Sequence, residues 1–302
     1  MLPVTVIITA FERTAFLRGA IESVLAQRLP PREIVVCDDS SSPAIRDICA
    51  AFGDRLEYRA NPQSLGVAAT VREAILAAKH PFVAILNDDD CWEPHFLGTL
   101  VPALLDHRDC VLSFGDHWIM DEAGCVDRDA TERNTRLYGR DRLATGQLSD
   151  TADLVLLQNA VPLAMSAVFR HEGIDWSLVT PEVGGAYDFW VTCLLSATGR
   201  PFAWSPVRVS RYRIHGKMET ARRSPARSEP LVHIFERLAA LDWFPGRQPL
   251  FQRQLALAWR ACGRDHLRQG DKSEARQCFL HSLKARPTLK SALGCLASFL
   301  PF

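Results

Sequence analysis

Residues 86–94, LNDDDCWEP, carry three consecutive carboxylates at positions 88–90, directly after an apolar run at residues 82–86. The run has the length of one buried strand, which puts the acids at its carboxyl end. Open α/β sheets bind ligands just beyond that end of their strands. Adjacent carboxylates repel one another, so a hard cation of the Mg²⁺ type, shared with substrate phosphates, is the predicted occupant. The alternative is an acidic turn before a helix that begins at Pro94.

Short apolar runs alternate with stretches of helical apolar spacing over the first hundred residues. The predicted strands are 4–8, 33–37, 56–58 and 82–86, and the predicted helices are 16–27, 45–52, 67–79 and 96–105. This alternation predicts an α/β fold with a mostly parallel, doubly wound, Rossmann-like sheet. The chain has no dinucleotide fingerprint after the first strand and no P-loop sequence, which argues against both of those enzyme classes.

The pattern is looser after residue 105. Strands are predicted at 110–114, 164–169 and 208–214, and a helix at 187–197. Residues 128–150 are dense in charge and show no apolar periodicity, so we expect a surface loop there.

Composition limits the classes of partner and compartment. The 302 residues are 47% hydrophobic, with 35 basic and 35 acidic residues and no basic tract, so we expect neither nucleic-acid binding nor a polybasic membrane site. Nine cysteines without a C-x-x-C pair are typical of reduced cytosolic thiols. We recognise no signal peptide and no apolar stretch of about 20 residues. The expected location is cytoplasmic, at most peripheral to the inner face of a membrane.

The acidic stretch resembles the metal motif of the family 2 inverting glycosyltransferases, which have the GT-A fold. That motif reads L-D-x-D-D-x-W-x-P, and the chain matches it at Leu86, Asp89, Asp90, Trp92 and Pro94. The resemblance implies that Asp89 binds Mn²⁺ or Mg²⁺ and that Asp88 contacts the ribose hydroxyls of a nucleotide sugar. Asn87, also assigned to the nucleotide sugar, replaces the first acid of the motif and supplies a neutral oxygen.

Three further segments resemble the nucleotide-contact motifs of this family. The implied donor-binding residues are Thr9, Ala10, Phe11 and Glu12 after the first strand, Asp38 and Asp39 in a D-D-x-S-like motif, and Asn61, Gly66 and Arg72. The family's carboxylate at Asp38 reads the uracil edge, where it would accept a hydrogen bond from the imide N–H. The alternatives are that Asp38 and Asp39 cap the next helix, and that Arg72 lies on a solvated helix face.

The acceptor side of the resemblance rests on Asp188 and His215. Asp188 follows Gly184 and Gly185 and stands at the family's catalytic-base position, whereas the alternative is an N-cap or first-turn acid of a helix. His215 closes a Y-R-x-H motif in which the histidine reaches the metal or the diphosphate. The alternative for His215 is a structural histidine. Loops around residues 115–165 are expected to choose the acceptor.

A polar, proline-containing stretch at residues 221–228 is the predicted linker between a catalytic domain, 1–220, and an α-helical tail, 229–302. The tail resembles a single tetratricopeptide repeat, with matches at Trp259, Gly263, Ala275, Phe279 and Pro287. Positions that usually hold Leu, Tyr and Ala carry Cys262, His266 and Ser282. One repeat cannot bury its own apolar face, so we expect it to dock on the catalytic domain, a protein partner or a second copy.

The resemblance implies an inverting, metal-dependent transferase that moves a sugar from a UDP-sugar to an acceptor hydroxyl, in surface polysaccharide or glycoconjugate synthesis. One alternative is a non-catalytic nucleotide-sugar-binding or scaffold protein that acts through its tail. Asn87 favours this alternative, because it replaces the first acid of the metal motif. Another is a sugar-1-phosphate nucleotidyltransferase, but that class needs a glycine-rich loop after the first strand. Residues 11–14 contain no glycine.

Overall fold

The computed structural model describes residues 1–216 and 224–299, which fall into two compact units. The first unit comprises residues 1–181 and 188–216, and the second comprises 182–187 together with the chain after Gly216. Of the predicted linker, residues 221–223 lie outside the described residues. Residues 225–228, also expected in the linker, form the first turn of a helix instead, because Pro225 at the first helical positions favours a helix start.

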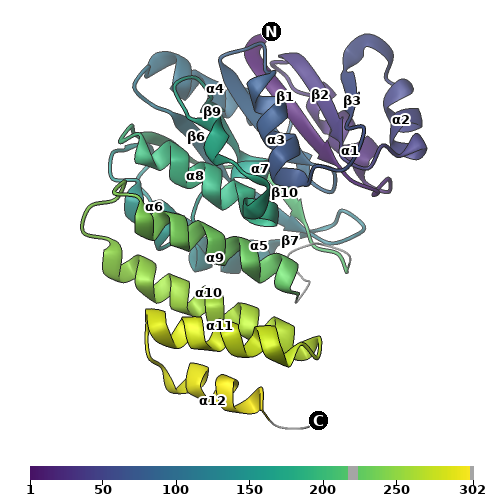
Figure 1. The fold of residues 1–302 in the computed structure, drawn as a ribbon. Helices are drawn as coiled ribbons and strands as arrows, with labels where there is room; N and C mark the ends of the chain where they lie inside the picture. Colours follow the sequence, from purple (N-terminus) through teal and green to yellow (C-terminus); the bar gives the residue numbers. More distant parts are fainter. Residues whose placement is uncertain (217–223, 300–302) are drawn as a thin grey trace. The chain divides into compact units, whose positions relative to one another are not determined.

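The first unit is built on one mixed sheet (Figure 1). Its strands are β1 (Leu2–Ala10), β2 (Pro31–Asp38), β3 (Glu57–Ala60), β4 (Phe82–Asn87), β5 (Cys91–Trp92), β6 (Leu112–Met120), β7 (Val126–Asp127), β8 (Gly146–Leu148), β9 (Ala167–Arg170) and β10 (Phe202–Arg213). The strand order is β3-β2-β1-β4-β9-β6-β10-β5, with β7 beside β6 and β8 beside β10. Strands β1 to β4 pair in parallel, as do β6 and β10, whereas β9 is antiparallel to both of its neighbours. This arrangement confirms the predicted mostly parallel α/β sheet.

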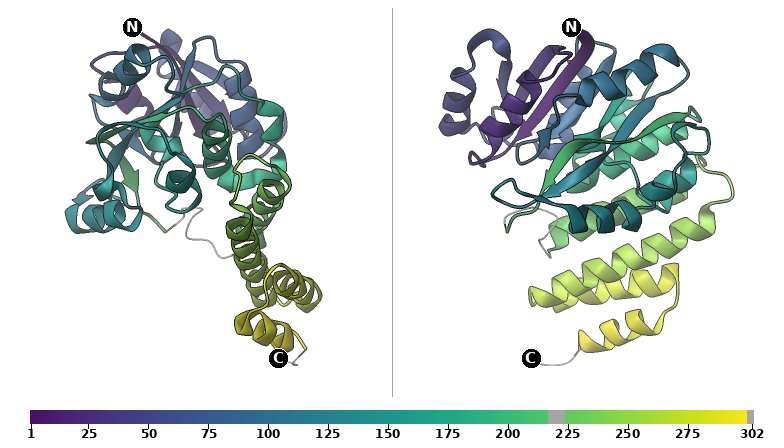
Figure 2. Two further views of the ribbon diagram at one scale, coloured as in Figure 1. Left: turned by 90° about the vertical axis from the view of Figure 1, so that its left-hand side faces the viewer. Right: turned by 180° about the vertical axis from the view of Figure 1, so that it is seen from behind.

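Helices cover both faces of this sheet (Figures 1 and 2). The helical segments are α1 (Leu17–Leu25), α2 (Pro43–Ala50), η1 (Gly53–Arg55), α3 (Val67–Leu76), α4 (Phe96–Asp106), α5 (Arg128–Leu137), η2 (Arg140–Arg142), α6 (Ala152–Leu156), α7 (Leu163–Ser166), η3 (Trp176–Leu178), η4 (Pro181–Ala186) and α8 (Tyr187–Ala197). Val4, Val6 and Ile8 point to one face of β1 and share a core with α1, α2 and α4. Helix α3 contacts β1 and β2 from the other face.

The expectation of a surface loop at residues 128–150 was wrong, because this segment contains α5, η2 and β8. The threonines of α5 are buried through hydrogen bonds rather than apolar contacts. Thr131 accepts from a backbone amide of β6 at 2.9 Å, and Thr135 donates to Asp116 at 2.7 Å. The buried guanidinium of Arg140 donates to the same carboxylate at 2.9 Å. A segment that packs through polar groups shows no apolar periodicity.

The second unit contains α9 (Pro225–Ala240), α10 (Gln248–Arg268), α11 (Lys272–Ala285) and α12 (Leu289–Ala297). The turn between α10 and α11 lies at Gly270, whose φ of +85° favours glycine. Phe279 of α11 is 1% exposed and packs against Gly263 of α10 and Gly294 of α12. The absence of side chains at these two glycines lets three helices approach one aromatic ring. No helix among residues 1–216 and 224–299 is long and apolar enough to cross a membrane.

We expect Gly294→Ala to destabilise the second unit by about 1–3 kcal/mol, because its Cβ would lie 2.5 Å from the Phe279 ring. At an open helical position the same change stabilises by about 0.5–1 kcal/mol. The control is Gly19→Ala in α1, where the nearest atom lies 4.0 Å from the added Cβ. Chemical denaturation measures the change in the free energy of unfolding of each variant, which should fall for Gly294→Ala and rise for Gly19→Ala. A rise for Gly294→Ala would contradict the packing described.

Candidate active site

The acidic stretch begins where β4 ends, beside the end of the parallel strand β1. Thr9 of β1 pairs in register with Asn87, and its hydroxyl donates to the Asn87 side-chain oxygen at 3.2 Å. Asn87, the departure from the acidic motif, is thus tied to β1. The three aspartates that follow are all buried: Asp88 is 2%, Asp89 8% and Asp90 1% exposed.

Positive groups from distant parts of the chain lie among these aspartates. The guanidinium of Arg13 bridges two of them, with Nη2 2.5 Å from Asp88 Oδ1 and Nη1 2.6 Å from Asp89 Oδ2. His215 lies on the other side, with Nε2 3.1 Å from Asp89 Oδ2. The structure therefore brings His215 to Asp89. It adds Arg13, which the sequence interpretation did not select, although a basic residue three positions beyond β1 is well placed to meet acids beyond β4.

Arg213, at the end of β10, holds the backbone of the same stretch. Its amide donates to Asp90 Oδ1 at 2.9 Å, and its Nε donates to the carbonyl oxygen of Asp89 at 2.9 Å. Among the described residues, Oδ2 of Asp88 and Oδ2 of Asp90 are buried without a hydrogen-bond partner. Unpartnered carboxylate oxygens of this kind suit a divalent cation, which binds oxygen ligands and supplies the missing charge.

Burial raises the pKa values of two of these carboxyl groups. The pKa of Asp88 rises to about 7, chiefly because the group is removed from water, although the positive charge of Arg13 opposes the rise. The pKa of Asp90 is raised well above its ordinary value by burial, with repulsion from Asp89 as the next cause. The cluster holds protons at neutral pH more readily than exposed aspartates do, and binding a cation there would release them.

Asp38, at the end of β2, is fully buried and its two oxygens each accept two hydrogen bonds. Ser40 donates to Oδ1 through its amide at 2.8 Å and its hydroxyl at 2.6 Å. The Ser42 amide and the Tyr58 hydroxyl donate to Oδ2 at 2.9 and 2.8 Å. The N-cap of α2 is Ser42, so Asp38 shapes the turn before this helix without occupying its cap position.

Asp39 organises the turn that precedes α3. Its carboxylate accepts from five donors at 2.7–2.9 Å: the side chains of Asn61, Ser64 and Thr70 and the amides of Leu65 and Gly66. Burial alone would raise the pKa of Asp39, but these hydrogen bonds, led by the Leu65 amide, outweigh it and lower the pKa. Gly66 has a φ of +80° at the N-cap of α3, a conformation that favours glycine. Asn61 and Gly66 thus lie around Asp39.

The exit of β1 joins these turns into one loop cluster. The amide of Asp39 donates to the Ala10 carbonyl oxygen at 3.0 Å, and the amide of Glu12 donates to the Ser40 hydroxyl at 3.2 Å. Glu12 has a φ of +55°, which is unusual for a residue with a side chain, and such positions concentrate at binding sites. Phe11 is 47% exposed. Hydrogen bonds therefore connect the end of β1 to the ends of both β2 and β4.

Arg72 and Asp188 are not part of that cluster of contacts. Arg72 pairs with Glu73 at 2.8 Å and donates to the Val179 carbonyl oxygen at 3.3 Å, beside an open hollow of about 510 Å³. Among the described residues, the hydrogen bonds and ion pairs of Arg72 and Asp188 do not reach Asp39 or residues 88–90. The Arg72 side chain is 27% exposed, so it lies partly in solvent.

Asp188 lies in the first turn of α8 and accepts a hydrogen bond from the Phe189 amide at 2.7 Å. This position is that of a first-turn acid, which a helix N-terminus stabilises. Burial nevertheless raises the pKa of Asp188, and the backbone amides only partly oppose the rise. A carboxyl group with a raised pKa accepts a proton more readily than an ordinary aspartate, as a general base requires.

Comparison with known sequences identifies relatives of the amino-terminal half. Residues 5–153 match the sequence profile described as "Glycosyl transferase family 2". A curated relative is the Escherichia coli "UDP-Glc:alpha-D-GlcNAc-diphosphoundecaprenol beta-1,3-glucosyltransferase WfgD", 27% identical over 126 residues. The match covers 41% of this chain and 49% of that relative. The chain thus spans about half of WfgD.

Solved structures resemble nearly the whole chain. S. aureus TarS 1–349 in complex with UDP-GlcNAc superposes with a TM-score of 0.66 at 12% identity, over 98% of this chain and 89% of that one. The mannosyltransferase PcManGT from Pyrobaculum calidifontis, in complex with GDP-Man and Mn²⁺, gives 0.58 at 17% identity, over 98% and 79%. At these identities the likeness concerns the fold, and it confirms the expected GT-A architecture.

We expect Arg13→Gln to destabilise the first unit by roughly 1–3 kcal/mol at pH 8.5 and by less at pH 5.5. The folded-state pKa of Asp88 is raised, so stability from its protonated form is present at low pH and lost as the pH rises through about 7. Loss of Arg13 increases the loss of stability at high pH, because Arg13 stabilises the ionised carboxylate of Asp88.

Thermal unfolding at both pH values measures the effect. The control is Arg18→Gln on α1, since Arg18 lies over the Phe52 ring and its loss should be insensitive to pH over this range. An Arg13→Gln effect that is equal at both pH values would contradict the electrostatic role.

Proposed function

We propose, given that residues 5–153 belong to glycosyl transferase family 2, that this chain transfers a sugar from a UDP-sugar to a hydroxyl group of a glycan or glycoconjugate. The reaction would serve the synthesis of a surface polysaccharide. The observation that carries the proposal is the buried acidic stretch at residues 88–90, which Arg13 and His215 flank at the joined ends of β1 and β4. Such a site combines carboxylates and an imidazole for a cation with the guanidinium of Arg13 for a diphosphate.

The donor is proposed to lie across the loop cluster at the strand ends. Thr9, Ala10, Phe11, Glu12, Asp38 and Asp39 would surround the nucleoside, Asn61 and Gly66 would form the adjacent turn, and Asn87 and Asp88 would face the ribose. Two observations on other proteins support a UDP-sugar: TarS was solved with UDP-GlcNAc, and the name of WfgD specifies UDP-Glc. Arg72 would contact phosphate only if it left Glu73.

Asp89 and His215 are the residues proposed to hold Mn²⁺ or Mg²⁺, with Asp88 beside them. The unpartnered buried oxygen of Asp88 and the Mn²⁺ in the PcManGT complex support this assignment. The cation would offset the negative charge of the diphosphate leaving group. Arg13 pairs with the same carboxylates, and its side chain is 34% exposed, so its guanidinium has room to turn towards the diphosphate.

Asp188 is the proposed general base. It would take the proton of the acceptor hydroxyl while that oxygen attacks the anomeric carbon on the face opposite the leaving UDP. One bond to the anomeric carbon forms as another breaks, so the configuration of that carbon inverts. The raised pKa of Asp188 supports the role and predicts that the rate rises with pH through that pKa.

A lipid-linked acceptor, as in the name of WfgD, would bring the chain to the cytoplasmic face of a membrane as a peripheral protein. The last helix offers a surface for a protein partner or a second copy. Its exposed apolar side chains are Leu289, Leu293 and Leu296, at 75%, 55% and 63% exposure. The catalytic domain, 1–220, and the repeat-like tail, 229–302, are proposed to act as a transferase with an attachment module.

The second candidate function is a non-catalytic nucleotide-sugar-binding protein. Two observations favour it: Asn87 is engaged by Thr9, and Arg13 already neutralises two of the acids. Such a protein would bind UDP-sugars but would not consume them in the presence of acceptor.

We expect UDP binding to require a divalent cation. Calorimetry with Mn²⁺ should give at least about tenfold tighter binding than with EDTA, because the carboxylates at 88–90 repel a diphosphate unless a cation lies between them. Asp89→Ala should bind UDP equally weakly with or without Mn²⁺. The control is Asp47→Ala, an exposed acid on α2, which should bind like wild type. Equal UDP affinity in all of these conditions would remove the cation from the proposal.

We expect Asp188→Asn to lower turnover by about 10²–10⁴-fold while UDP affinity and melting temperature stay near wild type. Asparagine keeps the size and much of the hydrogen bonding of aspartate but cannot accept the proton. The matched control is Asp129→Asn, the first-turn acid of α5, which should change neither property by much. Product formation is measured with a UDP-sugar panel and lipid-linked acceptors. Turnover of Asp188→Asn within a few-fold of wild type would make Asp188 a helix-terminus residue only.

A further inference from the structure

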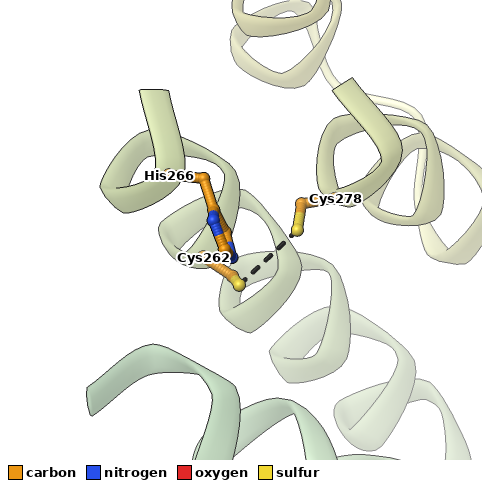
Figure 3. Close-up of side chains that lie close together, drawn as sticks. All are labelled: Cys262, His266 and Cys278. Carbon is orange, nitrogen blue, oxygen red and sulfur yellow. Dashed lines mark hydrogen bonds between the residues drawn. The ribbon is translucent and has the colours of Figure 1, made fainter. Parts of the chain in front are cut away.

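A second group of metal-ligating side chains lies in the helical unit, separate from the proposed transferase site in sequence. Cys262 and His266 are four residues apart on α10, so they share one helix face, and Cys278 faces them from α11 (Figure 3). One ligand atom from each side chain lies within 4.8 Å of the others. The Cys278 thiol donates to Cys262 Sγ at 3.5 Å. The group is enclosed, because the two cysteines are 1% and 3% exposed.

We propose that Cys262, His266 and Cys278 form a zinc-binding site of the Cys₂His type. Two thiolates and an imidazole are the ligand set that Zn²⁺ prefers, and ligands at positions i and i+4 of a helix can bind one ion. Zinc–sulfur bonds of about 2.3 Å in a tetrahedron put two sulfur ligands about 3.8 Å apart. The observed 3.5 Å between the sulfur atoms needs only a small adjustment of the two side chains.

The surroundings of His266 fit a metal-bound imidazole. Glu229 of α9 places Oε1 3.3 Å from Nε2, and Asp271 places Oδ2 3.8 Å from Nδ1. Whichever nitrogen binds zinc, a carboxylate lies near the other nitrogen and can orient the ring, as in carboxylate–histidine–zinc arrangements. The fourth ligand is water or the carboxylate next to the zinc-bound nitrogen. The ion would therefore connect α10 to α11 directly and α9 through Glu229.

The positions of these ligands distinguish the site from ordinary helix packing. Cys262 and His266 occupy the two positions of the repeat pattern that usually hold Leu and Tyr. Trp259, Gly263, Ala275 and Phe279 match the pattern, so these packing positions are kept while two of the three departures lie in the cluster. The third departure, Ser282, lies outside it and donates to the Ala256 carbonyl oxygen at 2.7 Å. A disulfide between Cys262 and Cys278 is the competing interpretation. It would leave the imidazole of His266, which lies between Glu229 and Asp271, without a metal to bind, whereas the zinc site uses all three ligands.

The test uses the full-length chain, reduced with a phosphine and stripped of metal by a chelator. After addition of Zn²⁺ and gel filtration, elemental analysis should find about one equivalent of zinc that Cys278→Ser and His266→Gln lose. Addition of Co²⁺ should produce thiolate-to-cobalt charge-transfer absorption, which a carboxylate site such as residues 88–90 does not give. Glu229→Gln should weaken zinc binding by roughly 10–100-fold, and loss of a direct ligand should weaken it further.

Two cysteine variants serve as controls. Cys91→Ser, next to the acidic stretch, and Cys295→Ser, on α12, should keep both the zinc and the cobalt absorption. The wild-type cobalt spectrum decides the matter even if a ligand variant fails to fold. No thiolate-to-cobalt absorption in the reduced wild-type chain overturns the proposal. So does a Cys262–Cys278 disulfide that forms in air while the reduced chain shows no thiolate-to-cobalt absorption.

Discussion

The first unit depends on the neutralisation of three buried carboxyl groups at the end of β4. Arg13 and Arg213 supply positive charge and hydrogen bonds, His215 lies 3.1 Å from Asp89, and these residues come from opposite ends of that unit's sequence. Because uncompensated buried charges cost several kcal/mol each, this cluster holds the exit of β1 and the end of β10 in place. The same side chains that stabilise the buried aspartates also make the site suitable for a cation and a diphosphate.

The apolar strands were predictable from the sequence, and the polar packing was not. Strands β1, β2 and β4 are largely buried and contain continuous apolar runs, whereas β3 is only partly buried. Residues 164–166, predicted as strand, instead form a helix that precedes β9, because a short apolar run fits either structure. Helix α5 and the following η2 were not predicted, because Thr131, Thr135 and Arg140 are buried through hydrogen bonds to β6 rather than through apolar contacts.

The candidate site was predictable where a motif names residues that meet in space, as with Asp89 and His215. It was not predictable where the partner belongs to no motif. Arg13 is one basic residue among many, and only the register of β1 against β4 places it on Asp88 and Asp89. The hydrogen bonds around Asp39 were only partly predictable for another reason. Two of its five donors are backbone amides, which carry no signal in the sequence.

The second unit is discontinuous, since residues 182–187 cluster with the helices that follow Gly216. Gly184 has a φ of +44°, and a Cβ there would lie 2.9 Å from the Pro230 ring of α9, so this segment and α9 are matched in shape. The next residue along the chain after this segment is Asp188. A single crossover downstream of β10 would exchange the carboxy-terminal helices between related genes. It would separate residues 182–187 from α9, the helix against which Gly184 packs. The heritable module is therefore larger than the tail, and its ancestry should be traced through residues 182–187 and the tail together.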